Sequence, residues 1–420
     1  MLGQYKKILI GLVDQIRYQQ AHQEDLNHLL SVQRSLITLI SDTERRIGGS
    51  KRRLQELKRL LRSRPSKEVS RRLKLRIDHT HAVLRRNFYL LFIWRCFGDA
   101  LAFSYVDKYA LKHLFYKTAT YDVKEEPGQM SGKLGLVHEW ALIERAREAG
   151  VPAILCDLTN TIRHGDVCLL GESDPFPIEV KSGSGRNARA GRQIESVRTL
   201  LDFFKTDNAT NFRGLPSVAR VAFTEPEVNH FAAIARCIGN SKRTGYAFTD
   251  PEPGLRYLCV RNAASARDAS DALAGPYIVV SLNEPKMTHS WMPYYPFVLS
   301  LREADTAYEF MDGSVSILVG LHVPTMVQLF DQQGMAATLV DHPDYAMTVQ
   351  NKGGVWGIDP SGAISRHLFV RVFLEFQSLA WFVRRERQQL DHLAEHFDDP
   401  RTDDLQSPTG IPEFQPLRWS

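Results

Sequence analysis

The chain is poor in cysteine and has no long hydrophobic run, and each absence narrows the class of protein. Its 420 residues include five cysteines, and no two of them form a CxxC pair. Such a set favours reduced thiols in a cytoplasmic protein over a disulfide scaffold. The most apolar run, FYLLFIW at residues 88–94, is far shorter than the roughly 20 residues that a membrane span needs. We therefore expect a cytoplasmic protein with no membrane partner.

Common nucleotide and zinc motifs are also missing. The GxxxxGK[ST] pattern of a phosphate-binding loop does not occur, so any nucleotide-driven or activation step would need a partner protein that supplies the NTPase. His138 and Glu139 begin like the zinc motif HExxH, but Leu142 stands where the second histidine would be. The cysteines and histidines elsewhere show no zinc-ligand spacing. The chain is therefore neither a P-loop NTPase nor a zinc enzyme of these types.

Proline and glycine are scarce in the first ~120 residues, which favours helix there. Hydrophobic residues recur at seven-residue intervals and predict a coiled-coil-like seam, with Leu29, Leu36 and Leu57 in one phase and Ile40, Ile47, Leu54 and Leu61 in another. The sequence Gly48-Gly49-Ser50 interrupts this seam and predicts a turn between two helices. Pro65-Ser66 predicts a second break.

Basic charge is concentrated in the same region. Residues 45–86 hold sixteen Lys or Arg and three acids, although the formal net charge of the whole chain is only +5. Such an imbalance favours contact with a nucleic-acid backbone, and the candidate contacts are Arg52, Arg53, Lys58 and Arg59. Two alternatives stay open. The charges could form a solvated coiled-coil face, or the helices could form a homodimer.

Changes of composition divide the chain into parts. We expect a helical, basic region over residues 1–125, a second domain over 126–262 and a C-terminal α/β domain over 276–395. Residues 396–420 resemble a flexible tail. The segment between 262 and 275, NAASARDASDALAG, is small and polar and is typical of a linker. In the C-terminal part, residues 277–282, 297–301 and 315–319 are expected as strands, and 366–395 as one long helix.

The central region alternates helix and strand. A helix over 133–149 is followed by strands at 151–157, 166–170 and 176–181, the last two joined by the turn sequence GESDP. A further helix is predicted over 191–204 and a strand over 218–223. On the third strand, Glu179 and Lys181 share one face, because side chains alternate along a strand, while Ile178 and Val180 point into a core. Asp166, across the hairpin, can lie next to Glu179.

Two carboxylates that converge on one point suit a hard cation such as Mg²⁺ or Mn²⁺. A lysine beside them can hold or activate a water molecule, and the metal can stabilise charge on a phosphate oxygen. Asp166 and Glu179 are the expected metal ligands, with the backbone carbonyl of Val180 as a third and Lys181 as the water-activating group. Asp157, Glu172 and Asp174 are possible additional ligands.

This pattern resembles the PD-(D/E)XK nuclease superfamily. Asp166 matches the Asp of its motif, and Glu179 and Lys181 match the ExK pair, although His164-Gly165 stands where the name-giving Pro would be. The resemblance covers about 100 residues from Lys133 onward, and it implies a restriction-endonuclease-like αβββαβ core. It also implies an acid on the preceding helix, a role that we assign to Glu139, with Glu144 as the alternative.

The segment after the ExK strand offers candidate contacts to DNA: Gln193, Arg186, Arg189 and Arg192. The resemblance implies a Mg²⁺- or Mn²⁺-dependent nuclease, acting on DNA rather than RNA, with a role in bacterial anti-phage or restriction-type defence. Two other functions stay open. One is a nucleic-acid-binding module whose nuclease fold does not cleave, and the other is a coiled-coil scaffold or partner subunit of a defence complex.

Overall fold

The computed structural model describes residues 2–116, 127–171, 173–180, 188–212, 215–262, 264–265, 269–354 and 361–396, apart from the side chains of 188–194, 215–217, 270 and 396. The chain is a mixed α/β protein with an N-terminal helical region, as expected. It forms two compact units. The first comprises residues 1–115, 124–198 and 287–299, and the second comprises 116–123, 199–286 and 300–420. These units divide the chain differently from the predicted boundaries at 125 and 262.

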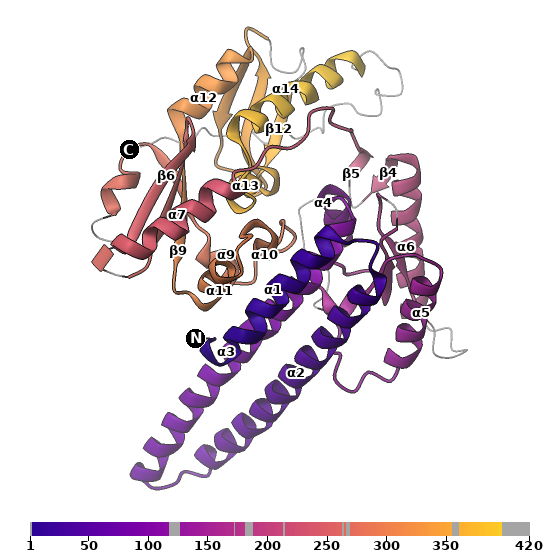
Figure 1. Cartoon of the computed structure of the whole chain (residues 1–420), viewed down its shortest axis with the longest axis vertical. Helices are drawn as coiled ribbons and strands as arrows, with labels where there is room; N and C mark the ends of the chain where they lie inside the picture. The colour runs from indigo at the N-terminus through magenta and orange to yellow at the C-terminus, as the bar shows by residue number, and fades with distance from the viewer. Residues whose placement is uncertain are drawn as a thin grey trace. The chain divides into compact units, whose positions relative to one another are not determined.

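The first unit begins with long helices (Figure 1). The long ones are α1 (Lys6–Ala21), α2 (Leu26–Arg62) and α3 (Lys67–Tyr105), and the short η1 (Gly3–Tyr5), α4 (Lys108–Leu111) and η2 (Lys112–Leu114) lie beside them in the sequence. Helix α2 starts where the Asp25 carboxylate accepts a hydrogen bond from the His28 amide at 2.9 Å, and α3 starts where Ser66 caps the Val69 amide. The predicted break at Pro65-Ser66 is therefore the turn between α2 and α3.

The predicted turn at Gly48-Gly49 is wrong, because α2 runs through both glycines without interruption. A glycine inside a helix costs only about 1 kcal/mol relative to alanine, which tertiary packing readily offsets. Here the buried side of α2, including Leu36, Ile40 and Ile47, lies along α3 and supplies that packing.

Helix α5 (Leu136–Glu148) and a three-stranded antiparallel sheet follow in the first unit. The strands β1 (Ala153–Leu155), β2 (Val167–Leu169) and β3 (Phe176–Ile178) lie in that order, with η3 (Cys156–Leu158) after β1. Their register pairs Ile154 with Cys168 and Cys168 with Pro177. Helix α6 (Ala188–Thr206) comes next.

The strands are shorter than predicted, and β3 ends before Glu179. Pro177 is buried, whereas the Phe176 side chain is 48% exposed and Ile178 is half-buried. The prediction that Ile178 marks the core face of this strand is therefore wrong. Alternation alone cannot decide which side of a short strand the rest of the chain covers.

The described residues of the second unit form three antiparallel sheets. The largest has the order β6-β7-β9-β8, from β6 (Tyr246–Glu252), β7 (Leu255–Val260), β9 (Ser316–His322) and β8 (Tyr277–Ser281). The others are β10-β11-β12, from β10 (Met335–Leu339), β11 (Tyr345–Asn351) and β12 (Ser361–Ser365), and β4-β5, from β4 (Asn208–Phe212) and β5 (Leu215–Ala219). The helices described after α6 include α7 (Phe231–Thr244), η4 (Ser270–Leu273), α9 (Asn283–Met287), α10 (Phe297–Ser300), α11 (Ala304–Asp312), α12 (Val323–Gln332), α13 (Arg366–Leu374) and α14 (Leu379–His396). Of these, α10 belongs mostly to the first unit, which includes residues 287–299.

Three predictions for the C-terminal half need correction. The sheet β6-β7-β9-β8 joins residues from both sides of segment 262–275, so that segment does not separate two domains. Residues 297–300, expected as strand, form the short helix α10. The expected helix over 366–395 is two helices, because Phe376 has a left-handed backbone (φ 51°) and Gln377 pairs with Asn229. A long-range contact therefore interrupts a locally helical pattern.

Candidate active site

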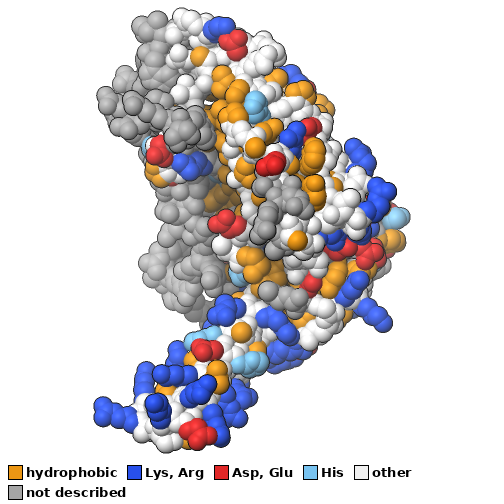
Figure 2. Space-filling view, turned by 90° about the vertical axis from the view of Figure 1, so that its left-hand side faces the viewer, with side chains coloured by type: hydrophobic (Ala, Val, Ile, Leu, Met, Phe, Trp, Pro, Cys, Tyr) orange, Lys and Arg blue, Asp and Glu red, His pale blue; other side chains and the backbone are white. Residues whose placement is uncertain are grey.

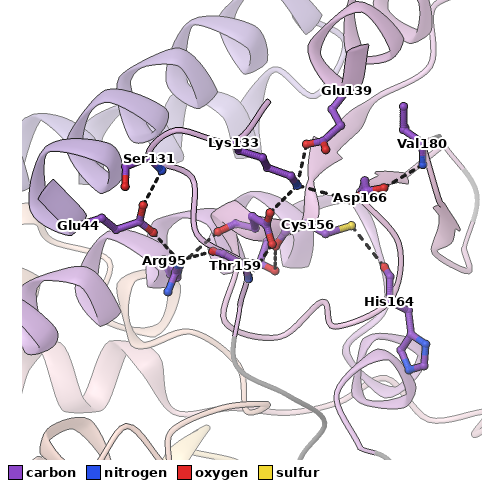
Figure 3. A network of polar contacts seen from close by, with 12 residues as sticks. Glu44, Arg95, Ser131, Lys133, Glu139, Cys156, Thr159, His164, Asp166 and Val180 are labelled. Atoms are coloured by element: carbon purple, nitrogen blue, oxygen red, sulfur yellow. Dashed lines mark hydrogen bonds and ion pairs between the residues drawn. The ribbon is translucent and has the colours of Figure 1, made fainter. Parts of the chain in front are cut away.

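Three carboxylates of the first unit converge on one ammonium group (Figure 3). The Nζ atom of Lys133 lies 2.9 Å from Oε2 of Glu139, 2.7 Å from Oδ2 of Asp157 and 3.4 Å from Oδ1 of Asp166. We call these four residues the acidic centre. It contains the helix acid and the motif Asp that the sequence predicts, together with Asp157 and a lysine that was not predicted.

The elements bring these side chains together by simple geometry. Glu139 lies in the first turn of α5, Asp157 lies in η3 directly after β1, and Asp166 immediately precedes β2. The Asp166 backbone extends the sheet, because its carbonyl accepts from the Cys156 amide at 2.9 Å and its amide donates to Ile178 at 2.8 Å. The centre therefore lies where one helix begins and two neighbouring strands meet.

The acidic centre is partly buried. The Glu139 side chain is 4% exposed, and those of Asp157, Lys133 and Asp166 are 17%, 21% and 23% exposed. Burial raises the pKa of Glu139, although Lys133 opposes that change. Burial by itself would lower the pKa of Lys133, but the charges of Asp157 and Glu139 outweigh it and raise that pKa above its ordinary value. Lys133 is therefore a permanent cation at neutral pH.

Residues of α2 and α3 hold Asp157 in place. Arg95 of α3 donates from Nε to the Asp157 carbonyl at 3.2 Å and forms a buried ion pair with Glu44 of α2 at 3.1 Å. Glu44 in turn accepts from the Ser131 amide at 2.7 Å. The Gly128 amide donates to the Asp157 carboxylate at 2.9 Å. The long helices thus support the acidic centre directly.

Glu179 and Val180 lie beside this centre. The Val180 amide donates to Oδ2 of Asp166 at 2.9 Å, so Asp166 contacts both Lys133 and the end of β3. Burial raises the pKa of the Cys156 thiol, and the neighbouring charges of Cys168, Asp157, Asp166 and Glu179 raise it further. The structure thus places the Val180 backbone against Asp166, and Glu179 and the Val180 carbonyl as metal ligands stay predictions.

Several predicted residues lie outside the described part of the chain or elsewhere in it. Lys181, Arg186 and Glu172 are outside the described residues, as are the side chains of Arg189, Arg192 and Gln193. Glu144, the alternative helix acid, is 43% exposed and forms an ion pair with Arg34 at 3.1 Å. It therefore lies away from the acidic centre. Asp174 is half-buried between β2 and β3.

The predicted basic contacts Arg52, Arg53, Lys58 and Arg59 all lie exposed on α2. They belong to the far part of the α2–α3 hairpin, and the acidic centre belongs to α5 and the three-stranded sheet. These two sets of residues are therefore two separate features of the first unit.

Lys133 is the functional candidate that sequence reasoning missed. The lysine stands between two glycines in SGKLG, just before α5, and its position six residues ahead of Glu139 allows it to reach back to that acid. A count of the charged residues around the motif would have found three acids, Glu139, Asp157 and Asp166, together with Lys133. The motif includes only the lysine of the ExK pair, and Lys133 lies outside it.

Comparison with models of known protein families, with curated proteins and with solved structures gave no match. None of the helices in the described ranges is long and apolar enough to cross a membrane. Across the same ranges, no three His, Cys, Asp or Glu side chains are already arranged to hold a metal ion. The three carboxylates of the acidic centre are instead arranged around Lys133.

Proposed function

We propose that the first unit is a metal-dependent nuclease that hydrolyses phosphodiester bonds, with DNA as the preferred substrate. One observation carries this proposal: three carboxylates from the start of α5 and the ends of two strands contact a single cation. The order α5-β1-β2-β3-α6 and the antiparallel sheet support it, because the resemblance to the PD-(D/E)XK superfamily implies the same order for these elements.

The donor set suits a divalent metal. All three groups are carboxylates, which are hard oxygen ligands of the type that Mg²⁺ and Mn²⁺ prefer. The three carboxylates already bind one cation, the Lys133 ammonium group, and the centre is partly exposed. A metal ion could therefore reach this centre and be held there. Asp166, Glu139 and Asp157 would hold the metal, with Glu179 beside them. A bound metal would stabilise charge on a phosphate oxygen and lower the pKa of a bound water.

The residues of the chain itself have distinct parts in this proposal. Val180 orients the Asp166 carboxylate through its amide, and Gly128 does the same for Asp157. Lys133 competes for the same oxygens, and once released from them it can neutralise a phosphate. Lys181 follows Val180 directly and would be the second cation at the reacting group.

The test is nicking of supercoiled plasmid by purified protein with Mg²⁺ or Mn²⁺. Helix α5 offers a matched pair, because Glu139→Gln removes one negative charge from the acidic centre and Glu144→Gln makes the same change outside it. We expect Glu139→Gln and Asp166→Asn to lower the rate at least 100-fold, and Glu144→Gln to stay within about twofold. The proposal fails if the wild type never nicks with either metal, or if Glu139→Gln cleaves as well as Glu144→Gln.

A second candidate is a nucleic-acid-binding module that does not cleave. The position of Lys133 favours it, because an ammonium group that contacts all three carboxylates already balances much of their charge without metal. Binding of DNA with no nicking under either metal would establish this alternative.

A further inference from the structure

The far part of the α2–α3 hairpin, residues 45–86, is a basic arm with a small hydrophobic core of its own. Leu57, Leu73 and Ile77 form that core, and Leu54 and Leu61 pack against it. Figure 2 shows Lys and Arg side chains over much of this end of the hairpin, with few acids among them. This core holds the two helices of the arm together and so fixes the side of the arm on which each basic residue lies.

Helical periodicity shows which side of the arm carries the lysines. Lys58 directly follows the buried Leu57 on α2, and Lys74 directly follows the buried Leu73 on α3. Lys51 and Lys67 stand seven residues before them, in the same heptad positions. In an antiparallel pair of helices these positions project from the same side of the seam.

A contact across the seam confirms this geometry. The Nζ atom of Lys51 on α2 lies 5.3 Å from the ring centre of Phe88 on α3. Phe88 stands fourteen residues after Lys74 and so shares its heptad position. The equivalent positions of the two helices therefore meet on one side of the arm.

This side is the basic face. It consists of the four lysines and of three arginines that neighbour the lysine positions on the surface of each helix. These residues, all exposed, are Lys51, Lys58, Arg62, Lys67, Arg71, Lys74 and Arg85. Asp78 is the acid among them, whereas Glu56 lies on the opposite side and Glu68 lies on the back of α3, facing away from the seam. Within the described part of the chain, none of the seven cations makes an ion pair, while Arg72 on the opposite side pairs with Glu68.

We propose that the basic face binds the sugar–phosphate backbone of a nucleic-acid duplex. From Lys67 to Arg85 the face is about 27 Å long, at ~1.5 Å per helical residue, which is roughly eight base-pair steps of ~3.4 Å. Unpaired lysines and arginines bind phosphates without reading the base sequence. Of the four predicted contacts, Lys58 alone lies on this face, and Arg53 lies on the opposite side.

Other partners fit this face less well. A second copy of the chain would bring seven like charges against seven, which costs free energy and opposes a dimer through this side. An interfacial membrane helix places large apolar side chains beside its cations. Of the exposed large apolar residues described on the hairpin, Leu60 and Val69 lie on the opposite side and Leu75 lies on the back of α3, which leaves Phe88 beside the lysines, in contact with Lys51.

The test measures binding of the full chain to a 30-base-pair DNA duplex by fluorescence anisotropy, in EDTA and across a salt series, so cleavage plays no part. The face variant is Lys58→Gln with Arg71→Gln and Lys74→Gln. The matched control is Arg53→Gln with Arg72→Gln and Arg76→Gln, which removes the same net charge from equivalent positions of the opposite side. Circular dichroism checks that both variants keep the helical content of the wild type.

We expect the face variant to lose at least tenfold in affinity near 0.1 M salt, and its salt-dependence slope to fall by about 2 to 3, at ~0.9 per phosphate contact. The control should stay within about threefold. Equal losses in both variants, or no loss in the face variant, would overturn the proposal. So would binding to vesicles containing anionic lipid as tight as to the duplex, or a dimer that only the face variant dissociates. A protein that binds through this face but never nicks would leave the proposal standing and remove the nuclease.

Discussion

At the scale of single residues, Lys133 is the cation at the middle of the acidic centre. Its ammonium group contacts Glu139, Asp157 and Asp166 at once, and a divalent cation would need the same oxygens. Binding of metal to this centre must therefore compete with an internal cation. This competition distinguishes the acidic centre from a simple cluster of free carboxylates, and it can be measured without any substrate.

Lys133→Met should bind Mn²⁺ more tightly than the wild type, by roughly tenfold, because the metal no longer has to displace an ammonium group from the carboxylates. Isothermal titration calorimetry measures this affinity directly. Lys58→Met, which removes the same charge from the basic arm, is the control and should bind Mn²⁺ as the wild type does. Weaker binding by Lys133→Met would mean that the lysine organises the carboxylates for the metal.

A second residue-scale prediction concerns Lys286 in the second unit. Its side chain is buried, and its Nζ atom donates to the Phe310 carbonyl and lies 4.2 Å from the centre of the Phe310 ring. Burial lowers the pKa of Lys286 from 10.5 to about 8. The unfolded chain therefore binds more protons than the folded protein between these two pH values, and the free energy of unfolding from this group rises with pH in that window.

Lys286→Met should remove this pH dependence, since methionine fills a similar volume without a charge. The melting temperature of the wild type relative to the variant should rise between about pH 8 and 10.5 and stay level below pH 7. Differential scanning calorimetry at matched ionic strength is the measurement. A constant difference across the whole range would show that Lys286 keeps an ordinary pKa in the folded protein.

At the scale of elements, continuity of α2 is what makes the basic arm long. The helix runs from Leu26 to Arg62 through Gly48 and Gly49, so its basic residues stand in regular rows. The local sequence favours a break there, and packing against α3 overrides it. Ile40, Ile47 and Leu54 keep the same seven-residue spacing across the two glycines. This unbroken spacing is the pattern that one continuous helix requires.

Gly49→Ala should stabilise the protein by about 0.5–1 kcal/mol, because alanine is the better helix former and a Cβ at this position meets nothing within 4 Å. Urea unfolding measures the change. Gly98→Ala on α3 is the contrasting variant. A Cβ there would come within 2.0 Å of the Leu158 carbonyl oxygen, and overpacking of this kind costs about 1–3 kcal/mol or more. Destabilisation by Gly49→Ala would argue for a turn at the glycines.

At the scale of the whole molecule, the long helices and the central sheet form one compact unit, where two domains were expected. The Gln33 side chain of α2 binds β1 as a neighbouring strand would, donating to the Ala153 carbonyl at 2.9 Å and accepting from the Leu155 amide at 3.1 Å. Asp99 of α3 accepts from the Asn160 and Thr161 amides, each at 2.8 Å. The helices therefore supply buried polar partners that the sheet region needs.

A fragment of residues 126–262, the predicted second domain, should fail to fold by itself. It would leave the backbone groups of β1 and of residues 160–161 without their partners, and each such buried group costs about 1–3 kcal/mol. A two-dimensional amide NMR spectrum of the fragment, compared with one of the full chain, tests this. A dispersed, folded spectrum from 126–262 would show that the central region is an independent domain after all.

The sequence by itself determined the local features of this protein. Heptad spacing predicted the long helices, Pro65-Ser66 marked their turn, and GESDP marked the hairpin that places Asp166 beside Ile178 at the end of β3. The acid on the preceding helix could be narrowed to Glu139 or Glu144 by pattern and resemblance. These features depend on residues that are close to one another in the sequence. Periodicity and turn composition therefore predict them directly.

Only the tertiary structure decided the rest. It places the buried Glu139 against Lys133 and Glu144 against Arg34, and it brings Asp157 into contact with the same lysine. It also joined the helices and the sheet through Gln33. All of these contacts link residues that no local pattern relates, because burial and charge pairing depend on which surfaces the whole chain brings together.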